Sequence, residues 1–421
     1  MSSSTIRLIP LGVLAACMRS ASTTAPGPTT DCNAPPASRE ASISVATPGN
    51  PFQALPSPDG CWLFVSIARG GNDRSEAGIA VYRRSAGKLA LARELRIAGS
   101  PAGMALTSDG KLLVVADNDR VAFIDADRLV SGRGSAILGY LIDTSAKGRV
   151  YANVTPDDKF AFIADENSAT VSVIDLAKAR ATHFDASSTV GKIHTGAAPI
   201  ALTFSPDQRR IYITSQRAPA NFGWPIECKR EANNPANDLT PVNPAGVVHV
   251  VDVQRAISGA PNPIIANVPA GCSPVRLVLS PDGSRAYVTA RNSNALLVFE
   301  TAKMSGGSQS GGGGGIGGAL IGRVPVGSSP VGVAVINAGR QVVVTNSNRF
   351  AGGANDTQSL TIVDAARVAD GASAIVGSIP AGAFPRELRV TADGRTLILT
   401  NFGSRTVQMV DLSRLPAPST R

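Results

Sequence analysis

The chain has 421 residues, of which 43% are hydrophobic and 17% are charged, and 40 basic against 31 acidic side chains give it a formal net charge of +9. This composition is sufficient for a large packed core. The positive charge is spread along the chain rather than clustered, which argues against a nucleic-acid groove. Beyond the first residues, no apolar stretch is long enough to span a bilayer.

The first residues look like a secretion signal. A short apolar run with one positive residue, Arg7, near its start leads to Leu14-Ala15-Ala16-Cys17, which resembles a bacterial lipobox. We therefore expect a signal peptide over residues 1–16 and, over residues 17–40, a flexible tether rich in Ser, Thr, Pro and Ala. Lipid on Cys17 would anchor the protein in the envelope of a bacterium, in the periplasm or on the cell surface. An ordinary signal peptide, or a wrongly assigned start codon, is the alternative.

A repeat follows, in which two apolar runs flank a tight polar turn. Pro presets φ in such a turn, Asp can hydrogen-bond its own backbone, and Gly accepts a positive φ. The turns are Ser57-Pro58-Asp59-Gly60, Thr107-Ser108-Asp109-Gly110, Thr155-Pro156-Asp157-Asp158, Ser205-Pro206-Asp207-Gln208, Ser280-Pro281-Asp282-Gly283, Ile336-Asn337-Ala338-Gly339 and Thr391-Ala392-Asp393-Gly394.

Each repeat predicts four strands, which we call A to D. In the fifth repeat they are residues 274–279, 286–289, 295–299 and 322–327. Related fourth-strand phrases carry Pro325 and Pro380, and Pro suits an edge strand because it lacks an N–H donor. Asp residues end most C strands, which indicates a turn-capping role. D is therefore expected to be the outer strand of an antiparallel blade.

Seven such units predict an all-β chain folded as a seven-bladed β-propeller over residues 41–415. The seventh repeat stops at its C strand, Thr406–Asp411. The missing D strand is found at the other end of the domain, where Ser42–Ala46 matches the D phrase. We expect this N-terminal strand to complete blade seven, which leaves no unpaired edge. A monomer is expected.

Several strand phrases resemble those of the YVTN-type β-propeller repeat proteins. They are Ala286-Tyr287-Val288-Thr289-Ala290, Val342-Val343-Val344-Thr345-Asn346 and Val171-Ser172-Val173-Ile174-Asp175. The resemblance covers roughly residues 42–411 and implies the fold. It implies little about activity, because lactonase-like, quinoprotein-associated and haem d1-like propellers share this scaffold.

Four cysteines remain if Cys17 carries lipid, and propeller topology pairs them. The B–C and D–A connections lie on one face of a propeller, and the A–B and C–D connections lie on the other. Cys228 and Cys272 fall on the first face in neighbouring blades, whereas Cys32 and Cys61 fall on the second. The predicted disulfides are therefore Cys228–Cys272 and Cys32–Cys61, with four reduced thiols as the alternative. No cysteine spacing indicates a metal.

Candidate binding residues gather on the B–C/D–A face. The largest insertion, residues 215–246, carries Phe222 and Trp224, which could stack on a sugar or peptide or could cap the propeller. Arg149, Arg276 and Arg386 stand near the D–A connections of three repeats. If they converge at the channel mouth they could hold a carboxylate or phosphate, and otherwise each pairs with a nearby carboxylate or faces solvent.

Two hypotheses of function follow. The first is a non-catalytic binding or scaffold module without a cofactor, whose ligand is an unidentified protein or carbohydrate. The second is a lactonase-like hydrolase that acts on a sugar lactone with a divalent cation at the channel mouth, held by carboxylates of two adjacent B–C loops. The candidate ligands of that cation are Asp117, Asp119, Asp165 and Glu166. The three histidines fall on different blades, and no catalytic triad is evident.

Overall fold

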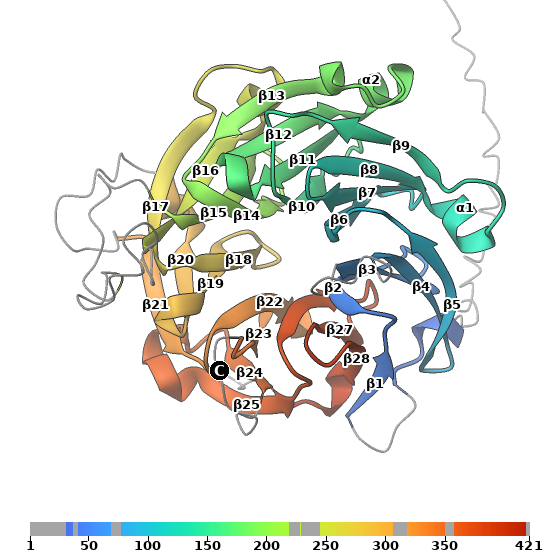
Figure 1. Cartoon of the computed structure of the whole chain (residues 1–421). Helices are drawn as coiled ribbons and strands as arrows, with labels where there is room; N and C mark the ends of the chain where they lie inside the picture. The colour runs from blue at the N-terminus through green and yellow to red at the C-terminus, as the bar shows by residue number, and fades with distance from the viewer. Residues whose placement is uncertain are drawn as a thin grey trace, which may run out of the picture.

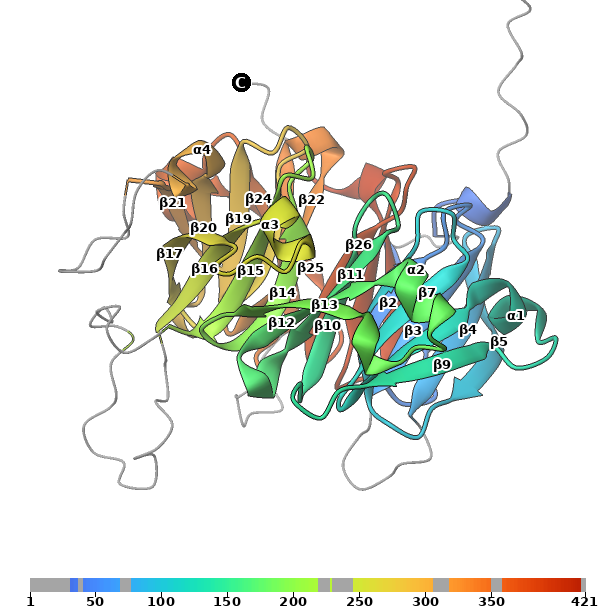
Figure 2. The same cartoon turned by 90° about the horizontal axis from the view of Figure 1, so that it is seen from above.

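The computed structural model describes residues 31–36, 41–68, 77–218, 228, 245–305, 318–349 and 358–417. These residues form seven four-stranded antiparallel sheets that stand around a common axis (Figure 1). Seen from the side, the ring is a thick disc whose strands run between its two faces (Figure 2). The predicted all-β, seven-bladed β-propeller is confirmed.

The strands of each blade run from the ring axis outwards in the order A to D. The A strands are β2 (Asn50–Pro56), β6 (Pro101–Leu106), β10 (Arg149–Val154), β14 (Ala197–Phe204), β18 (Pro274–Leu279), β22 (Pro330–Ile336) and β26 (Pro385–Val390). The B strands are β3 (Trp62–Ala68), β7 (Leu112–Asp117), β11 (Phe160–Asp165), β15 (Arg210–Arg217), β19 (Arg285–Ala290), β23 (Gln341–Asn346) and β27 (Thr396–Asn401).

The outer half of each blade is built from the two remaining strands. The C strands are β4 (Gly78–Ser85), β8 (Arg120–Asp125), β12 (Thr170–Asp175), β16 (Ala245–Asp252), β20 (Ala295–Glu300), β24 (Ser359–Asp364) and β28 (Thr406–Asp411). The D strands are β5 (Lys88–Arg96), β9 (Ile137–Ile142), β13 (Thr189–His194), β17 (Ile264–Cys272), β21 (Leu320–Pro325), β25 (Ile375–Pro380) and β1 (Ser42–Ala46).

The ring closes as the sequence predicts. β1 pairs antiparallel with β28, so that Ser42 lies opposite Val410 and Ala46 lies opposite Thr406. The hydroxyl of Tyr82 in blade one also donates a hydrogen bond to the carbonyl of Ala46 at 2.9 Å. The first strand of the propeller is thus joined both to the last sheet and to the first one.

The A–B turns explain the repeated Ser/Thr-x-Asp-x phrase. In blade five, Ser280 Oγ donates to Asp282 Oδ1 at 2.5 Å and accepts a hydrogen bond from the backbone N–H of Arg285 at 3.0 Å. The Ser280 hydrogen bond, with further ones from Ser284, lowers the pKa of Asp282 to about 2. Gly283 has a φ of +71°, which a residue with a side chain rarely adopts. The turn residues therefore fix the register of the strands that they join.

Short helical segments occupy the connections between strands. The α-helices are α1 (Ala126–Ser131), α2 (Leu176–Ala181), α3 (Val253–Ile257) and α4 (Thr301–Met304). The 3₁₀ turns are η1 (Asp31–Asn33), η2 (Glu166–Ser168), η3 (Ala186–Ser188), η7 (Arg291–Ser293), η8 (Asn337–Gly339), η9 (Val368–Ala374) and η10 (Leu412–Arg414).

The capping role predicted for the last Asp of the C strand is confirmed. Asp125, Asp175 and Asp252 each accept a hydrogen bond from a backbone N–H in the first turn of the following α-helix. Such a carboxylate satisfies one of the unpaired donors at the helix N-terminus. Repetition of this Asp therefore reflects the C–D connection rather than an active site.

Both predicted disulfides are confirmed. The Cα atoms of Cys32 and Cys61 lie 4.6 Å apart, and those of Cys228 and Cys272 lie 5.3 Å apart. Two disulfides indicate an oxidising environment, extracellular or periplasmic. In the part of the chain that the structure describes, no helix has the length and apolar character needed to cross a membrane.

Candidate functional site

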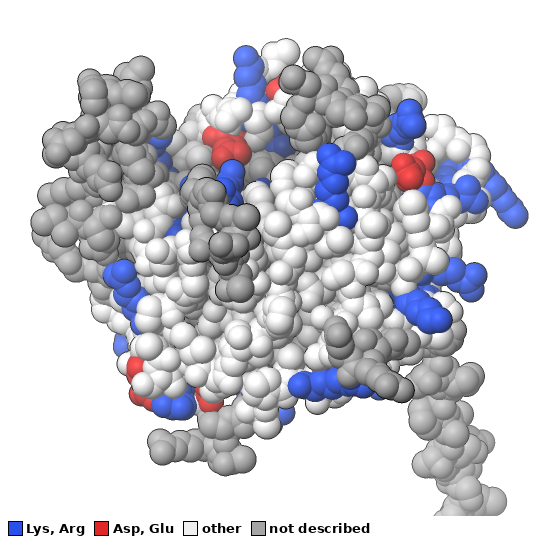
Figure 3. All heavy atoms as spheres, turned by 60° about the horizontal axis from the view of Figure 1, so that its bottom comes forward, with Lys and Arg blue, Asp and Glu red and all other residues white. Residues whose placement is uncertain are grey.

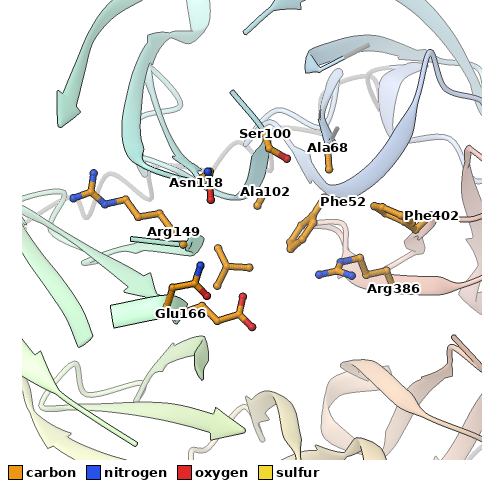
Figure 4. Close-up of a pocket in the computed structure, with 12 residues that line it drawn as sticks. Phe52, Ala68, Ser100, Ala102, Asn118, Arg149, Glu166, Arg386 and Phe402 are labelled. Atoms are coloured by element: carbon orange, nitrogen blue, oxygen red, sulfur yellow. The ribbon is translucent and has the colours of Figure 1, made fainter. Parts of the chain in front are cut away.

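A cavity of about 240 Å³ lies beside the ring axis on the B–C/D–A face, among blades one, two, three and seven. The A strands supply Phe52 and Arg386 to its wall, and the B–C connections supply Asn118, Glu166 and Phe402. Figure 4 shows the side chains of Arg386 and Glu166 facing one another across this cavity. The side chains directed to the cavity are therefore a buried arginine, an acid, amide groups and aromatic rings, whereas Arg149 also contributes to the wall but turns its guanidinium away (Figure 4).

Arg386 is the basic group of the cavity. It is only 9% exposed, and its guanidinium carbon lies 3.7 Å from the ring centroid of Phe52. Its Nε is buried and has no hydrogen-bond partner among the described residues. Burial and the neighbouring Arg276 lower the pKa of Arg386 to about 9, and a guanidinium with that pKa still keeps its proton at neutral pH. The side chain is thus a buried cation whose hydrogen-bonding capacity is not used up by the protein.

Three blades meet across the ring axis near Arg386. Arg276 of β18 donates through Nε to Glu387 of β26 at 2.5 Å, and both side chains are buried. The Arg276 guanidinium also lies 4.7 Å from the ring centroid of Tyr151 in β10. The Tyr151 hydroxyl in turn accepts a hydrogen bond from Arg389 at 2.7 Å. We call these four residues the axial network, and it joins blades three, five and seven.

Glu166 faces a strongly positive environment. Desolvation raises its pKa, and the positive charges of Arg386, Arg276, Arg291 and Arg349 oppose that rise. Arg291 and Arg349 belong to the B–C connections of blades five and six, and burial lowers the pKa of both, most strongly that of Arg291, to about 10. Four guanidinium groups therefore act on one cavity carboxylate.

The three arginines named from the sequence do not share one environment. Arg276 and Arg386 lie close enough for their charges to interact, as the lowered pKa of Arg386 shows. Arg149 instead points away from the cavity (Figure 4). It is buried and donates to Asp165 at 3.3 Å and to the carbonyl of Leu141 at 3.0 Å. Arg149 thus holds blades two and three together, and the structure brings only two of the three arginines to the mouth.

The four carboxylates named as alternative metal ligands are also separated by their partners. Asp117 pairs with Arg120 at 2.7 Å and Asp165 pairs with Arg149, whereas Asp119 is exposed and Glu166 faces the arginines. Within the described residues, no group of three or more His, Cys, Asp or Glu side chains is placed to hold a metal ion. The cation proposed at this mouth therefore stays a prediction for which these residues form no shared site.

Other predicted residues lie outside the described part of the chain. They are Phe222 and Trp224 of the largest insertion and Cys17 of the lipobox. Sequence reasoning also missed several residues that build the cavity and the axial network. Neither Phe52 nor Tyr151 is among the residues named from the sequence, although each stands near the start of an A strand, where side chains reach the mouth.

Two solved structures share the fold. Hydrazine synthase of Kuenenia stuttgartiensis superposes with a TM-score of 0.62 at 18% identity, over 88% of this chain and 97% of that chain. The β-propeller domain of Cps50 (Swd1) of Myceliophteria thermophila gives a TM-score of 0.57 at 10% identity, over 88% of this chain and 99% of that domain. At these identities the likeness shows the fold alone.

The sequence matches no protein-family model and no curated protein. The relationship to the YVTN-type propellers therefore stays a prediction, whereas the propeller class rests on the seven blades themselves.

Proposed function

We propose that the chain is an exported β-propeller that binds an anionic partner on its B–C/D–A face and does not transform it. The observation that carries this proposal is the charge at the channel mouth. Arg276, Arg291, Arg349 and Arg386 contribute four positive charges, and Glu166 and Glu387 contribute two negative ones, which leaves a surplus of two positive charges. Clustered guanidinium groups with partial burial are suited to binding carboxylates or phosphates.

The described residues favour binding over catalysis. Among the histidines, His249 is buried in β16 and hydrogen-bonded to Asn267 and Ser215, whereas His183 and His194 belong to the C–D connection and the D strand of blade three. Asp117 of blade two and Asp165 of blade three are each held by an arginine of the same blade. These groups stabilise the blades and do not converge on the cavity as an acid–base pair.

One outer face of the molecule differs from the mouth in the spacing of its charges. On the face shown in Figure 3, the Lys and Arg side chains that are drawn in blue stand singly, with a few acidic side chains between them. An anion approaching the propeller would therefore meet isolated exposed charges over this outer face and a group of partly buried charges at the mouth. Partly buried charges bind more strongly, because solvent screens them less.

Binding is tested with the full chain and an anionic polymer, polygalacturonate, with neutral dextran as comparison. The variant Arg291→Gln/Arg349→Gln removes two charges at the rim of the mouth. Its matched control Arg128→Gln/Arg367→Gln removes two arginines of C–D connections, one exposed and one half-buried. We expect the rim variant to bind polygalacturonate roughly tenfold more weakly and the control to bind normally, since close charge pairs determine affinity. Equal affinity of all three proteins would contradict the proposal.

Export and anchoring belong to the same proposal. The two disulfides place the propeller in an oxidising compartment, and the lipobox phrase before Cys17 would attach it to a membrane. Mass spectrometry of the protein purified from bacterial membranes should find acyl chains on an N-terminal Cys17. A Cys17→Ser variant should then appear in the soluble exported fraction, and recovery of an unmodified Cys17 in the mature protein would refute anchoring.

A further inference from the structure

We propose that the cavity beside Arg386 binds one small hydroxy acid, such as a single hexuronate unit, with its carboxylate on Arg386 and a hydroxyl group on Glu166. This inference deepens the binding function proposed above, because it names the site and the class of ligand. It depends on the cavity, on the unused hydrogen-bonding capacity of Arg386 and on the side chains that face it (Figure 4).

The buried guanidinium of Arg386 indicates an anion. It is 91% removed from solvent, and Glu387, the acidic residue next to it in the chain, is already engaged by Arg276. A buried charge without a hydrogen-bonded counterion is costly, and so is a buried donor left without an acceptor. The guanidinium carbon lies 3.7 Å from the ring centroid of Phe52, and the end of the Arg386 side chain is directed to the cavity (Figure 4). A carboxylate in the plane of the guanidinium would accept two parallel hydrogen bonds.

The remaining wall of the cavity is suited to hydroxyl groups. Glu166 accepts hydrogen bonds, and the Asn118 amide both donates and accepts them. Phe402 adds an apolar surface, against which the carbon-bound hydrogens of a sugar ring can pack. A hexuronate combines the three features that this wall and Arg386 accommodate: a carboxylate, several hydroxyl groups and an apolar ring face.

The size of the cavity limits the ligand to one such unit. Its volume of about 240 Å³ is below the ~300–1,000 Å³ that is typical of sites for drug-sized ligands. The axial network of Tyr151, Arg276, Glu387 and Arg389 crosses the ring axis next to the cavity. A polymer would therefore insert its terminal unit from the B–C/D–A face and could not pass through the ring.

The charge balance favours a hydroxy acid over an amino acid. Around Glu166, four guanidinium groups already exceed the two carboxylates by two charges. An ammonium group would add a further positive charge to this group, and like charges at close range destabilise a complex. A hydroxyl group donates the same hydrogen bond to Glu166 without adding charge.

The proposal is tested by isothermal titration of the full chain with four probes: D-galacturonate, D-galactose, L-alanine and inorganic phosphate. We expect binding of galacturonate and at least tenfold weaker binding of the other three. The variants Arg386→Gln and Glu166→Gln should each lose about tenfold in affinity for galacturonate, and Arg128→Gln on α1 should bind like the unchanged protein. If Arg386→Gln fails to fold, the affinity of Glu166→Gln for galacturonate decides the test. Glu166 is only partly buried, so this substitution should leave the fold intact.

The outcomes separate this inference from the function that it rests on. Polygalacturonate binding without galacturonate binding would overturn the cavity assignment and leave the binding face intact. If galactose bound as tightly as galacturonate, Arg386 would not be the group that holds the ligand carboxylate. If phosphate bound as tightly as galacturonate, the cavity would be a simple anion site, and the hydroxy-acid assignment would be wrong. Loss of affinity for polygalacturonate in the rim variant, with no binding of any of the four small probes, would place the partner on the rim alone.

Discussion

Arg276 and Glu387 form a buried ion pair although 111 positions separate them in the chain. Arg276 lies on the inner strand of blade five and Glu387 on that of blade seven, so the pair spans the ring next to the candidate cavity. Each of the two groups compensates for the cost of burying the other. This ion pair explains why Arg386, the immediate neighbour of Glu387, has no hydrogen-bonded acidic partner among the described residues.

Glu387→Gln should destabilise the propeller strongly, because it leaves Arg276 buried without a counter-charge. We expect the free energy of unfolding to fall by about 3–5 kcal/mol, measured by denaturant titration. The matched control is Asp370→Asn, which removes the exposed acidic partner of Arg367 and should cost less than about 1 kcal/mol. The double variant Glu387→Gln/Arg276→Met should recover part of the loss, and a purely additive effect would mean that the pair is not coupled.

Stability should fall in mildly acidic solution because of His249. Its Nε2 accepts a hydrogen bond from the Gly196 N–H at 2.9 Å, so the ring is neutral with its proton on Nδ1, which faces Asn267. Burial lowers the pKa of His249 to about 4, whereas the unfolded chain protonates this residue near 6.5. The unfolded state therefore binds more protons between these values, and folding stability decreases as the pH falls from about 6.5 to about 4.

The size of this loss of stability follows from the difference between the pKa of His249 in the unfolded and folded states. That difference corresponds to about 3 kcal/mol of unfolding free energy over the whole pH range. The difference in unfolding free energy between the unchanged protein and His249→Gln, measured at several pH values, isolates it. The unchanged protein should lose more stability than the variant on acidification. Parallel pH profiles of the two proteins would rule His249 out as the source.

The two disulfides should stabilise the domain separately. They close chain segments with sequence separations of 29 and 44 residues, for which chain-entropy arguments give about 3–4 kcal/mol each. We expect Cys32→Ser/Cys61→Ser and Cys228→Ser/Cys272→Ser each to lower the melting temperature, and reduction of the unchanged protein to have the combined effect. If neither double variant changed the melting temperature, the disulfides would not stabilise the domain as a whole and would order only the segments next to them.

The pairing of β1 with β28, which closes the ring, should keep the protein monomeric. Deleting residues 41–46 removes β1 and leaves the backbone of β28 without its pairing strand. Exposed strand edges pair with other chains, so the deletion variant should form dimers or larger aggregates in light scattering, whereas the full propeller should be a monomer. A monomeric deletion variant of unchanged stability would show that β1 is dispensable.

The sequence predicts the fold and the disulfides well because a repeat assigns each residue a place within its blade. The Asp found in six of the seven A–B turns and the Asp that ends most C strands keep their roles in successive blades, as Asp282 and Asp252 illustrate. Once the faces of the propeller are known, Cys228 and Cys272 can only meet on one of them. These conclusions follow from topology and do not depend on side-chain direction.

The site is predicted less well because it does depend on side-chain direction. Arg149 is the first residue of its strand, Arg386 the second and Arg276 the third, and the A–B pairing shifts register close to each of them. A one-residue offset turns a strand side chain to the opposite face. Arg149 is consequently directed to Asp165, whereas Arg276 and Arg386 reach the channel. Glu166 was a candidate cation ligand in the lactonase-like hypothesis, whereas in the structure the charges of four arginines act on it.

The central claim is that the cavity beside Arg386 receives a carboxylate, and a crystal structure of the full chain grown with D-galacturonate tests it most directly. The account predicts the carboxylate within about 3 Å of the Arg386 guanidinium nitrogens and a ring hydroxyl within hydrogen-bond distance of Glu166. Galacturonate bound elsewhere on the propeller, or bound in the cavity with its carboxylate turned away from Arg386, would contradict the account.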